Sequence, residues 1–140
     1  MIKDIVVNLE HDASRDRASE FAITVAEAFD AHVAGVAFAY APDFPGYVML
    51  EIPPNIIAAM VEESKKAAEA AIRRFDEAAK RSLLSAEHRL VRTIGMEAPT
   101  LFAAIARRFD LSVILQSSPD GVANDDMIES VLLESGRPVI

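Results

Sequence analysis

The sequence has no cysteine among its 140 residues. That absence excludes a disulfide framework, a thiol nucleophile and a cysteine-bound metal. There is also no uninterrupted apolar run of the roughly 18 residues that a membrane-spanning helix requires. The first apolar run is short and lies between Asp4 and Glu10, which is typical of a strand rather than a signal peptide. We therefore expect a cytoplasmic protein with no membrane contact.

The sequence has fewer positively charged than negatively charged residues. The chain has 14 Lys and Arg against 22 Asp and Glu, so its formal net charge is −8. A field of that sign repels nucleic-acid phosphates. The basic side chains occur as pairs inside helical patterns that also carry carboxylates, which is typical of solvated helix faces. We expect no nucleic-acid partner.

Glycine is scarce, and no glycine lies in the turn directly after the first predicted strand. A dinucleotide site needs the pattern G-x-G-x-x-G at that place, so that the backbone can approach a pyrophosphate. The phosphate loop G-x-x-x-x-G-K-[ST] and the nucleophile elbow G-x-S-x-G are also absent. No set of catalytic groups is visible, and we expect no enzyme activity. The five glycines are Gly35, Gly46, Gly95, Gly121 and Gly136.

Strand and helix patterns alternate along the whole chain. This order predicts one α/β domain over residues 1–140, with a five-stranded, doubly wound parallel sheet and helices on both faces. The third strand carries several charged residues, which places it at a sheet edge. The last strand has only three residues, and we expect that the chain ends before this strand is complete. The predicted strands are 5–7, 32–40, 86–93, 111–115 and 138–140, and the main helices are 55–84, 97–109 and 126–134 after a first helix ending near 29.

Three local features carry further expectations. Gly35 lies inside the second strand, where a missing side chain permits close packing. Asp12 or Ser14 is suited to cap the first helix. The segment 41–54 is long for a loop and rich in apolar residues. It is either a flap folded over the end of the sheet or a contact surface for a partner or small ligand.

Two polar clusters resemble reactive sites only superficially. Glu10, His11 and Asp12 are consecutive on a turn, so their side chains point in different directions, and no second histidine lies at metal-ligand spacing. We interpret them as turn and cap residues and expect no metal site. Ser117 and Ser118 have no base beside them and are interpreted as loop hydrogen-bonding residues.

The ends of the chain carry two short motifs. The opening Lys-Asp-Ile-Val-Val-Asn-Leu-Glu and the closing Ser-Gly-Arg-Pro-Val-Ile, together with the order of elements, resemble the universal stress protein family. The resemblance covers essentially the whole chain and implies the strand order 3-2-1-4-5. It also implies a choice between an ATP-binding and a non-binding branch of the family.

The ATP-binding branch has motifs that can be placed on this sequence. Its acidic residue after the first strand, which holds the adenosine, matches Glu10. Its phosphate-binding Gly-x-x-Gly segment matches Gln116 and Pro119, neither of which supplies an open glycine backbone. Its Gly-Ser pair before the last helix falls on Asp125 and Asp126, or on Glu129 and Ser130 if the loop spacing is kept. A carboxylate at that helix start repels phosphate.

The resemblance implies a stress-response or regulatory module that acts through dimerisation and protein contacts, without ordinary ATP binding or another cofactor. The alternative is an adenine-nucleotide-binding protein that uses Glu10 and a rebuilt phosphate loop, with ATP as its ligand. We expect a homodimer or a tandem pairing through the last strand, and a possible protein partner at residues 41–54. The residues equivalent to the nucleotide pocket are Asn8, Glu10, Phe38, Leu115, Gln116, Ser118, Pro119, Asp125 and Asp126.

Overall fold

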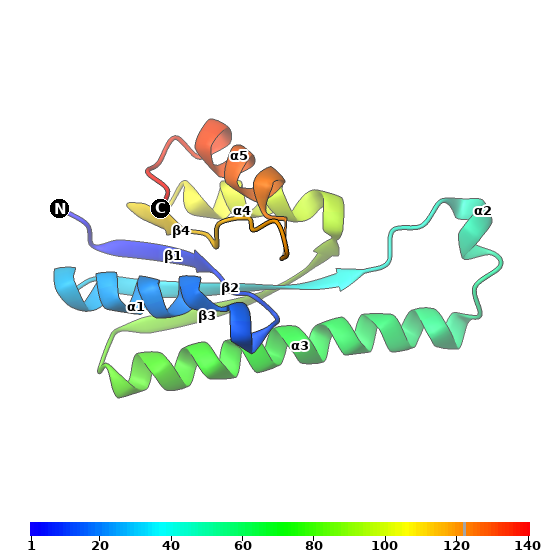
Figure 1. Ribbon diagram of the computed structural model, residues 1–140, viewed down its shortest axis with the longest axis horizontal. Helices are drawn as coiled ribbons and strands as arrows, with labels where there is room; N and C mark the ends of the chain where they lie inside the picture. The colour runs from blue at the N-terminus through cyan, green and yellow to red at the C-terminus, as the bar shows by residue number, and fades with distance from the viewer. Residues whose placement is uncertain (122) are drawn as a thin grey trace.

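The computed structural model describes residues 1–121 and 123–140, and its elements alternate as the sequence predicts (Figure 1). The strands are β1 (Asp4–Asn8), β2 (His32–Ala41), β3 (Ala86–Ile94) and β4 (Leu111–Val113). The α-helices are α1 (Arg17–Phe29), α2 (Gly46–Met49), α3 (Pro54–Arg81), α4 (Ala98–Ala106) and α5 (Asp125–Glu134). Two short 3₁₀ helices, η1 (Ala13–Arg15) and η2 (Gly95–Glu97), precede α1 and α4.

The sheet has the strand order β3-β2-β1-β4, and every pair in it is parallel. The polar strand β3 pairs with β2 alone among the described strands, which confirms its predicted place at an edge. β1 and most of β2 are buried, as central parallel strands that helices cover on both faces must be. The order of these four strands agrees with the predicted order.

The prediction of five strands is wrong for the described chain, because the last segment forms a single bridge and no ladder. Val139 is bridged in parallel to Ser112 of β4, flanked by the bonds from Ser112 N to Pro138 O and from Ile140 N to Ser112 O. Pro138 has no N–H to donate, and a ladder needs a second paired residue beyond Val139. The segment still lies beside β4, where the fifth strand was predicted.

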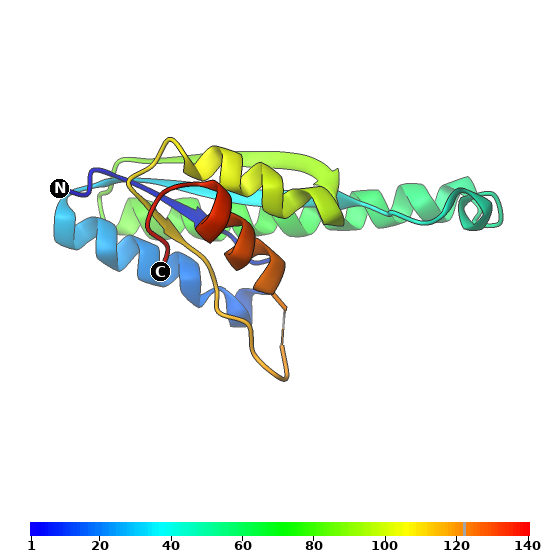
Figure 2. The same cartoon turned by 90° about the horizontal axis from the view of Figure 1, so that it is seen from above.

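Helices cover both faces of the sheet (Figures 1 and 2), and an apolar layer lies beneath them on each face. Ile5 and Val7 of β1 face α1 and α3, whereas Val6 between them faces α4 and α5. This alternation follows from the two-residue period of a strand. Helices therefore cover both faces, as predicted.

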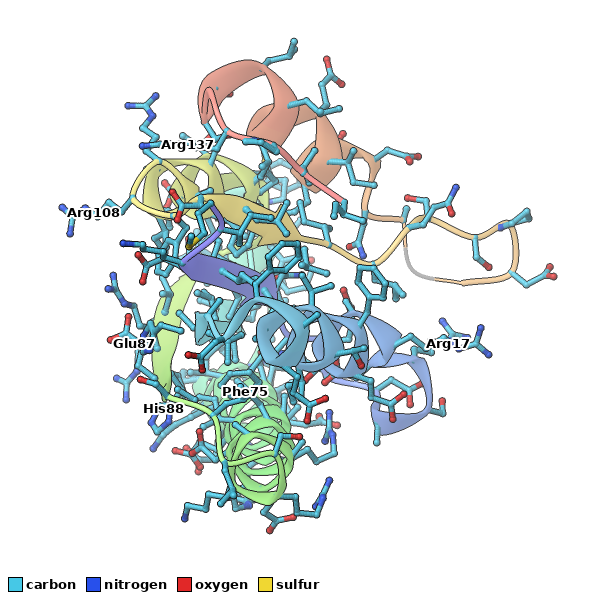
Figure 3. All side chains as sticks on the ribbon, turned by 90° about the vertical axis from the view of Figure 1, so that its left-hand side faces the viewer. Arg17, Phe75, Glu87, His88, Arg108 and Arg137 are labelled. Atoms are coloured by element: carbon cyan, nitrogen blue, oxygen red, sulfur yellow. The ribbon has the colours of Figure 1, made fainter. Side chains whose placement is uncertain are left out.

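Gly35 allows α3 to approach the sheet closely. A Cβ atom at this position would lie 2.8 Å from the Cδ1 atom of Phe75 and 3.0 Å from the Cδ1 atom of Leu9. Phe75 is fully buried between α3 and the sheet (Figure 3). The close packing expected at Gly35 is confirmed, and a larger residue there would overpack this layer.

The segment after β2 leaves the body of the protein instead of covering it. Figures 1 and 2 show α2 and the first part of α3 extending well beyond the end of the sheet. We call residues 42–66 the arm. Tyr47 is 73% exposed and Leu50 is 90% exposed. The interpretation as a flap folded over the sheet end is therefore wrong, because the segment follows the direction of β2 and α3 outward.

Among the described residues, no helix combines the length and the apolar character needed to cross a membrane. The same residues contain no group of three or more histidine, aspartate or glutamate side chains arranged to hold a metal ion.

Candidate functional site

The candidate site lies where β1 and β4 end side by side. β1 pairs with β2 on one side and β4 on the other, so the chain reverses its winding direction between β1 and β4. In doubly wound sheets, ligands bind beyond the carboxyl ends of the strands at this point. The segments that follow the two strands, 9–16 and 114–121 with 123–124, form the candidate site.

Glu10 is the buried centre of this region. Its Oε1 atom accepts a hydrogen bond from Asn124 Nδ2 at 3.0 Å and another from Asn8 Nδ2 at 3.3 Å. The residue is only 8% exposed. Burial raises the pKa of the Glu10 carboxyl, and the bond from Asn124, the neighbouring His11 and the bond from Asn8 oppose that rise.

Asn124 connects the two halves of the site, although it is not among the residues predicted from the sequence. It occupies the N-cap position of α5, but its side chain does not cap the helix. Its Nδ2 also donates to the carbonyl of Leu115 at 3.0 Å, and its backbone N–H donates to Ser117 Oγ at 2.7 Å. The hydrogen-bonding role predicted for Ser117 is confirmed. An asparagine before two aspartates at a helix start is a recognisable N-cap signal, but that signal does not reveal the bond to Glu10.

Arg74 of α3 fixes the backbone at the end of β1. Its Nη2 atom donates to the carbonyls of Glu10 at 2.9 Å and His11 at 3.1 Å, and lies 4.0 Å from Asp16 Oδ2. His11 in turn places its Nε2 atom 2.6 Å from the carbonyl oxygen of Phe38. These contacts support the turn role predicted for His11 and hold the Glu10 segment rigidly against β2 and α3.

Asp16, and not Asp12 or Ser14, caps α1. Its Oδ1 atom accepts from Ser19 N at 3.3 Å. Asp12 instead caps η1 by accepting from Ser14 N at 2.9 Å. The prediction failed because a short 3₁₀ turn precedes the helix and shifts its start to Arg17. Burial raises the pKa of Asp16 to about 6.

An open cleft of about 490 Å³ lies beside the buried network. Its lining includes the predicted residues Leu115, Gln116 and Ser118. Arg15 and Arg17, which lie between β1 and α1 and at the start of α1, also line it. Figure 3 shows Arg17 extending outward on the side of the molecule where the loop 116–121 lies. Arg15 lies 3.6 Å from Asp12 and 3.5 Å from the carbonyl of Asp120. The cleft is thus lined by two cationic side chains that were not predicted to lie there.

The remaining predicted residues are distributed around this cleft. Phe38 is in the core, with its ring centroid 6.4 Å from that of Phe102. Asp125 and Asp126 begin α5, and Asp126 lines a separate hollow of about 330 Å³ against α4. Glu129 and Ser130 lie inside α5, so the alignment that put them at its start is wrong. Pro119 lies in the same loop as Gln116 and Ser118.

No protein-family model and no curated protein sequence matches this chain. Several solved structures do. The universal stress protein UspA from Lactobacillus plantarum superposes with a TM-score of 0.75 and 16% sequence identity. The match covers 99% of this chain and 96% of the Lactobacillus chain. The universal stress protein from Archaeoglobus fulgidus in complex with dAMP superposes with a TM-score of 0.61 and 20% sequence identity. The match covers 100% of this chain and 98% of the Archaeoglobus chain. A universal stress protein family protein from Arabidopsis thaliana with AMP bound superposes with a TM-score of 0.64 and 13% sequence identity. The match covers 99% of this chain and 89% of the Arabidopsis chain. This chain has the universal stress protein fold.

The fold implied by the two terminal motifs is therefore confirmed over nearly the whole chain. Within the universal stress protein fold, this chain places Glu10 after the first strand and Asn124 at the start of the last helix, 3.0 Å apart. A direct bond thus links the two segments that flank the cleft.

Replacing Asn124 by alanine should raise the pKa of Glu10 further. The Nδ2 bond from Asn124 favours the ionised carboxylate, so its loss leaves burial opposed by fewer hydrogen bonds. A carboxyl-detected NMR titration would measure the change. Asn55→Ala, in the exposed first turn of α3, is the control and should leave Glu10 unchanged. An unchanged titration of Glu10 in Asn124→Ala would contradict the assigned bond.

Proposed function

We propose that this chain is a universal stress protein-like regulatory module that acts through dimerisation and protein contacts, without ordinary ATP binding. The observation that carries the proposal is the internal pairing of Glu10. Its Oε1 atom accepts bonds from Asn8 and Asn124, and the residue is buried. The resemblance assigns the adenosine contact to this position. A nucleotide that contacts Glu10 would have to share this carboxylate with the two amides or displace them, and displacement would leave buried polar groups unpaired.

The phosphate side of the site supports the same proposal. Asp125 and Asp126 occupy the first turn of α5, where the free N–H groups of a helix otherwise attract anions. Their carboxylates offset the partial positive charge of that helix end. Pro119 replaces a glycine and offers no N–H. Together these features are expected to weaken ATP binding at least tenfold relative to a glycine-bearing loop, a change of about 1.4 kcal/mol.

One observation favours the alternative of an adenine nucleotide held by a rebuilt loop. Arg15 and Arg17 line the cleft beside Gln116 and Ser118, and guanidinium groups bind phosphate oxygens well. A nucleotide that binds in this way would contact the two arginines and not the start of α5.

Isothermal titration with ATP, AMP and dAMP distinguishes the two candidates. We expect no binding in the micromolar range for any of the three. Micromolar affinity for ATP would overturn the proposal. If that affinity were lost in both Arg15→Ala and Arg17→Ala, the rebuilt-loop alternative would be supported.

The dimerisation part of the proposal involves the edge beside β4. The bridge between Ser112 and Val139 uses the carbonyl of Pro138 and the N–H of Ile140. The N–H of Val139 therefore points away from β4, toward a side where none of the described strands pairs with it. Unpaired strand edges favour pairing with another chain. Val139→Pro removes that donor, and light scattering should then detect weaker dimerisation if the edge is used.

A further inference from the structure

The long helix α3 has two halves with different surroundings. Its buried residues begin at Ala68 and continue through Ala71, Ile72, Phe75 and Ala79. In the fully described span 54–67, no residue is buried. At 1.5 Å per residue, about 20 Å of this helix lies beyond the core. Figures 1 and 2 show the same division, with the first part of α3 extending past the sheet together with α2.

The apolar stripe of α3 does not stop where the core stops. Ile57, Met60 and Val61 precede Ala68 and Ala71 at the spacing that keeps residues on one helix face. In the second half of α3 this face packs against the sheet. Around Ser64, whose Oγ accepts from Tyr40 N at 2.7 Å, the helix still borders the ends of β2 and β3, and the turns before it are the more open part. Met60 is 39% exposed even though it lies on the stripe. A helix face with this pattern is suited to pack against another helix.

The apolar surface of the arm is large enough for a stable contact. Its exposed large apolar residues are Phe44, Tyr47, Leu50, Ile56, Met60 and Val61. Scaled by the roughly 150–250 Å² of a large side chain, their exposed fractions leave about 600 Å² of apolar surface on each arm. These residues are spread over α2, the loops beside it and the first turns of α3, so this area is the total for the whole arm.

A second copy of this chain fits that surface in both area and charge. If two arms cover each other, they bury about 1,200 Å² in total, which reaches the lower limit of stable protein interfaces. The α3 part of the arm is neutral, because Glu62 and Glu63 are balanced by Lys65 and Lys66, and Asp43 and Glu51 give the whole arm a formal charge of only −2. Two molecules of net charge −8 repel each other overall, and a neutral segment at the contact limits that repulsion.

We propose that two copies of this chain pair through their arms, with the first halves of their α3 helices packed antiparallel around a two-fold axis near Met60 and Val61. Such a contact uses the same surface on both molecules and therefore closes at two copies. The inference rests on the proposed function, since it names the partner and the surface of a module that acts through protein contacts. It uses a surface separate from the edge at Val139.

Two substitutions in the full-length chain test the pairing. Met60→Glu places a charge in the contact, and the dissociation constant should rise at least about tenfold. The mass measured by light scattering should fall to half of the wild-type mass, whether the wild type is an arm dimer or a tetramer that also uses the Val139 edge. Leu83→Glu is the matched control, because Leu83 is 93% exposed just past the other end of the same helix. Circular dichroism should show both variants folded.

Crosslinking gives an independent readout, because the chain has no cysteine of its own. A short bismaleimide crosslinker should join two copies of Met60→Cys and should not join two copies of Leu83→Cys. Equal crosslinking of the two variants would overturn the pairing, as would an unchanged mass in Met60→Glu.

The remaining outcomes separate this inference from the proposed function. If Val139→Pro halves the mass and Met60→Glu does not, the arm pairing is overturned and dimerisation through the edge stands. Micromolar ATP affinity in a chain whose arms still crosslink would overturn only the proposed function. A wild type that is monomeric at every concentration and gives no crosslink overturns the pairing and leaves the arm to a partner of different sequence.

Discussion

Replacing Phe75 by alanine is expected to lower the free energy of unfolding by about 3–5 kcal/mol. Phe75 is fully buried and packs between α3 and the sheet in the layer that α1 also covers. Its removal deletes a large apolar contact and leaves a cavity, because the surrounding helix and strands relax only partly. Denaturant unfolding followed by circular dichroism measures the change.

A comparison with Gly35 shows whether the loss is specific to this contact. Gly35→Ala alone should cost about 1–3 kcal/mol, because the added Cβ would lie 2.8 Å from the Phe75 ring. In a Phe75→Ala background the same change should cost less, since the ring is gone and only the contact with Leu9 remains, and the double-mutant cycle should report the coupling. Phe29→Ala is the control and should have a smaller effect, because Phe29 is already 48% exposed. Additive effects of the two core changes would contradict the assigned contact.

Replacing Asp16 by asparagine is expected to stabilise the protein above about pH 6. Burial raises the pKa of Asp16 to about 6, from an ordinary value of 3.8. Between these values the folded protein holds a proton that the unfolded chain has released, so stability falls as the pH rises through this window. A difference of about two pKa units corresponds to roughly 3 kcal/mol. Asparagine stays neutral and can still accept the capping bond from Ser19.

The pH dependence of unfolding tests this expectation. The stability advantage of Asp16→Asn over the wild type should be largest above about pH 7 and should shrink by roughly 3 kcal/mol toward pH 4. Asp43→Asn, on the exposed arm, is the control for removing a carboxylate at the surface. If the stability advantage of Asp16→Asn were the same at every pH, the charge of the Asp16 carboxylate would not be its cause.

Much of the fold could be predicted because it depends on local patterns. The alternation of apolar runs, the charged residues of β3 and the position of Gly35 were sufficient for the parallel sheet, its edge and its closest helix contact. Two predictions failed for reasons that are not local. The last segment makes one bridge to Ser112 and no strand. The arm was interpreted as a flap because apolar residues usually cover a core, and pattern alone cannot show that the covering is missing.

The candidate site was harder to predict, because its side chains come from distant parts of the sequence. Glu10 was found from its place after the first strand. Asn124 and Arg74, which contact Glu10, are 114 and 64 residues away from it. Nothing in their own surroundings indicates those bonds. Arg15 and Arg17 were likewise recognisable as surface charges, but their position at the cleft depends on how the loop 116–121 folds back.

The division of α3 also affects how this protein can evolve. Changes in the second half of the helix alter the core and are limited by stability. Residues in the first half contribute almost nothing to the core, so they can change at little cost to folding. Selection can therefore alter what the arm recognises while the rest of the molecule stays the same, and related chains with this fold could acquire different partners by substitutions in one short stretch.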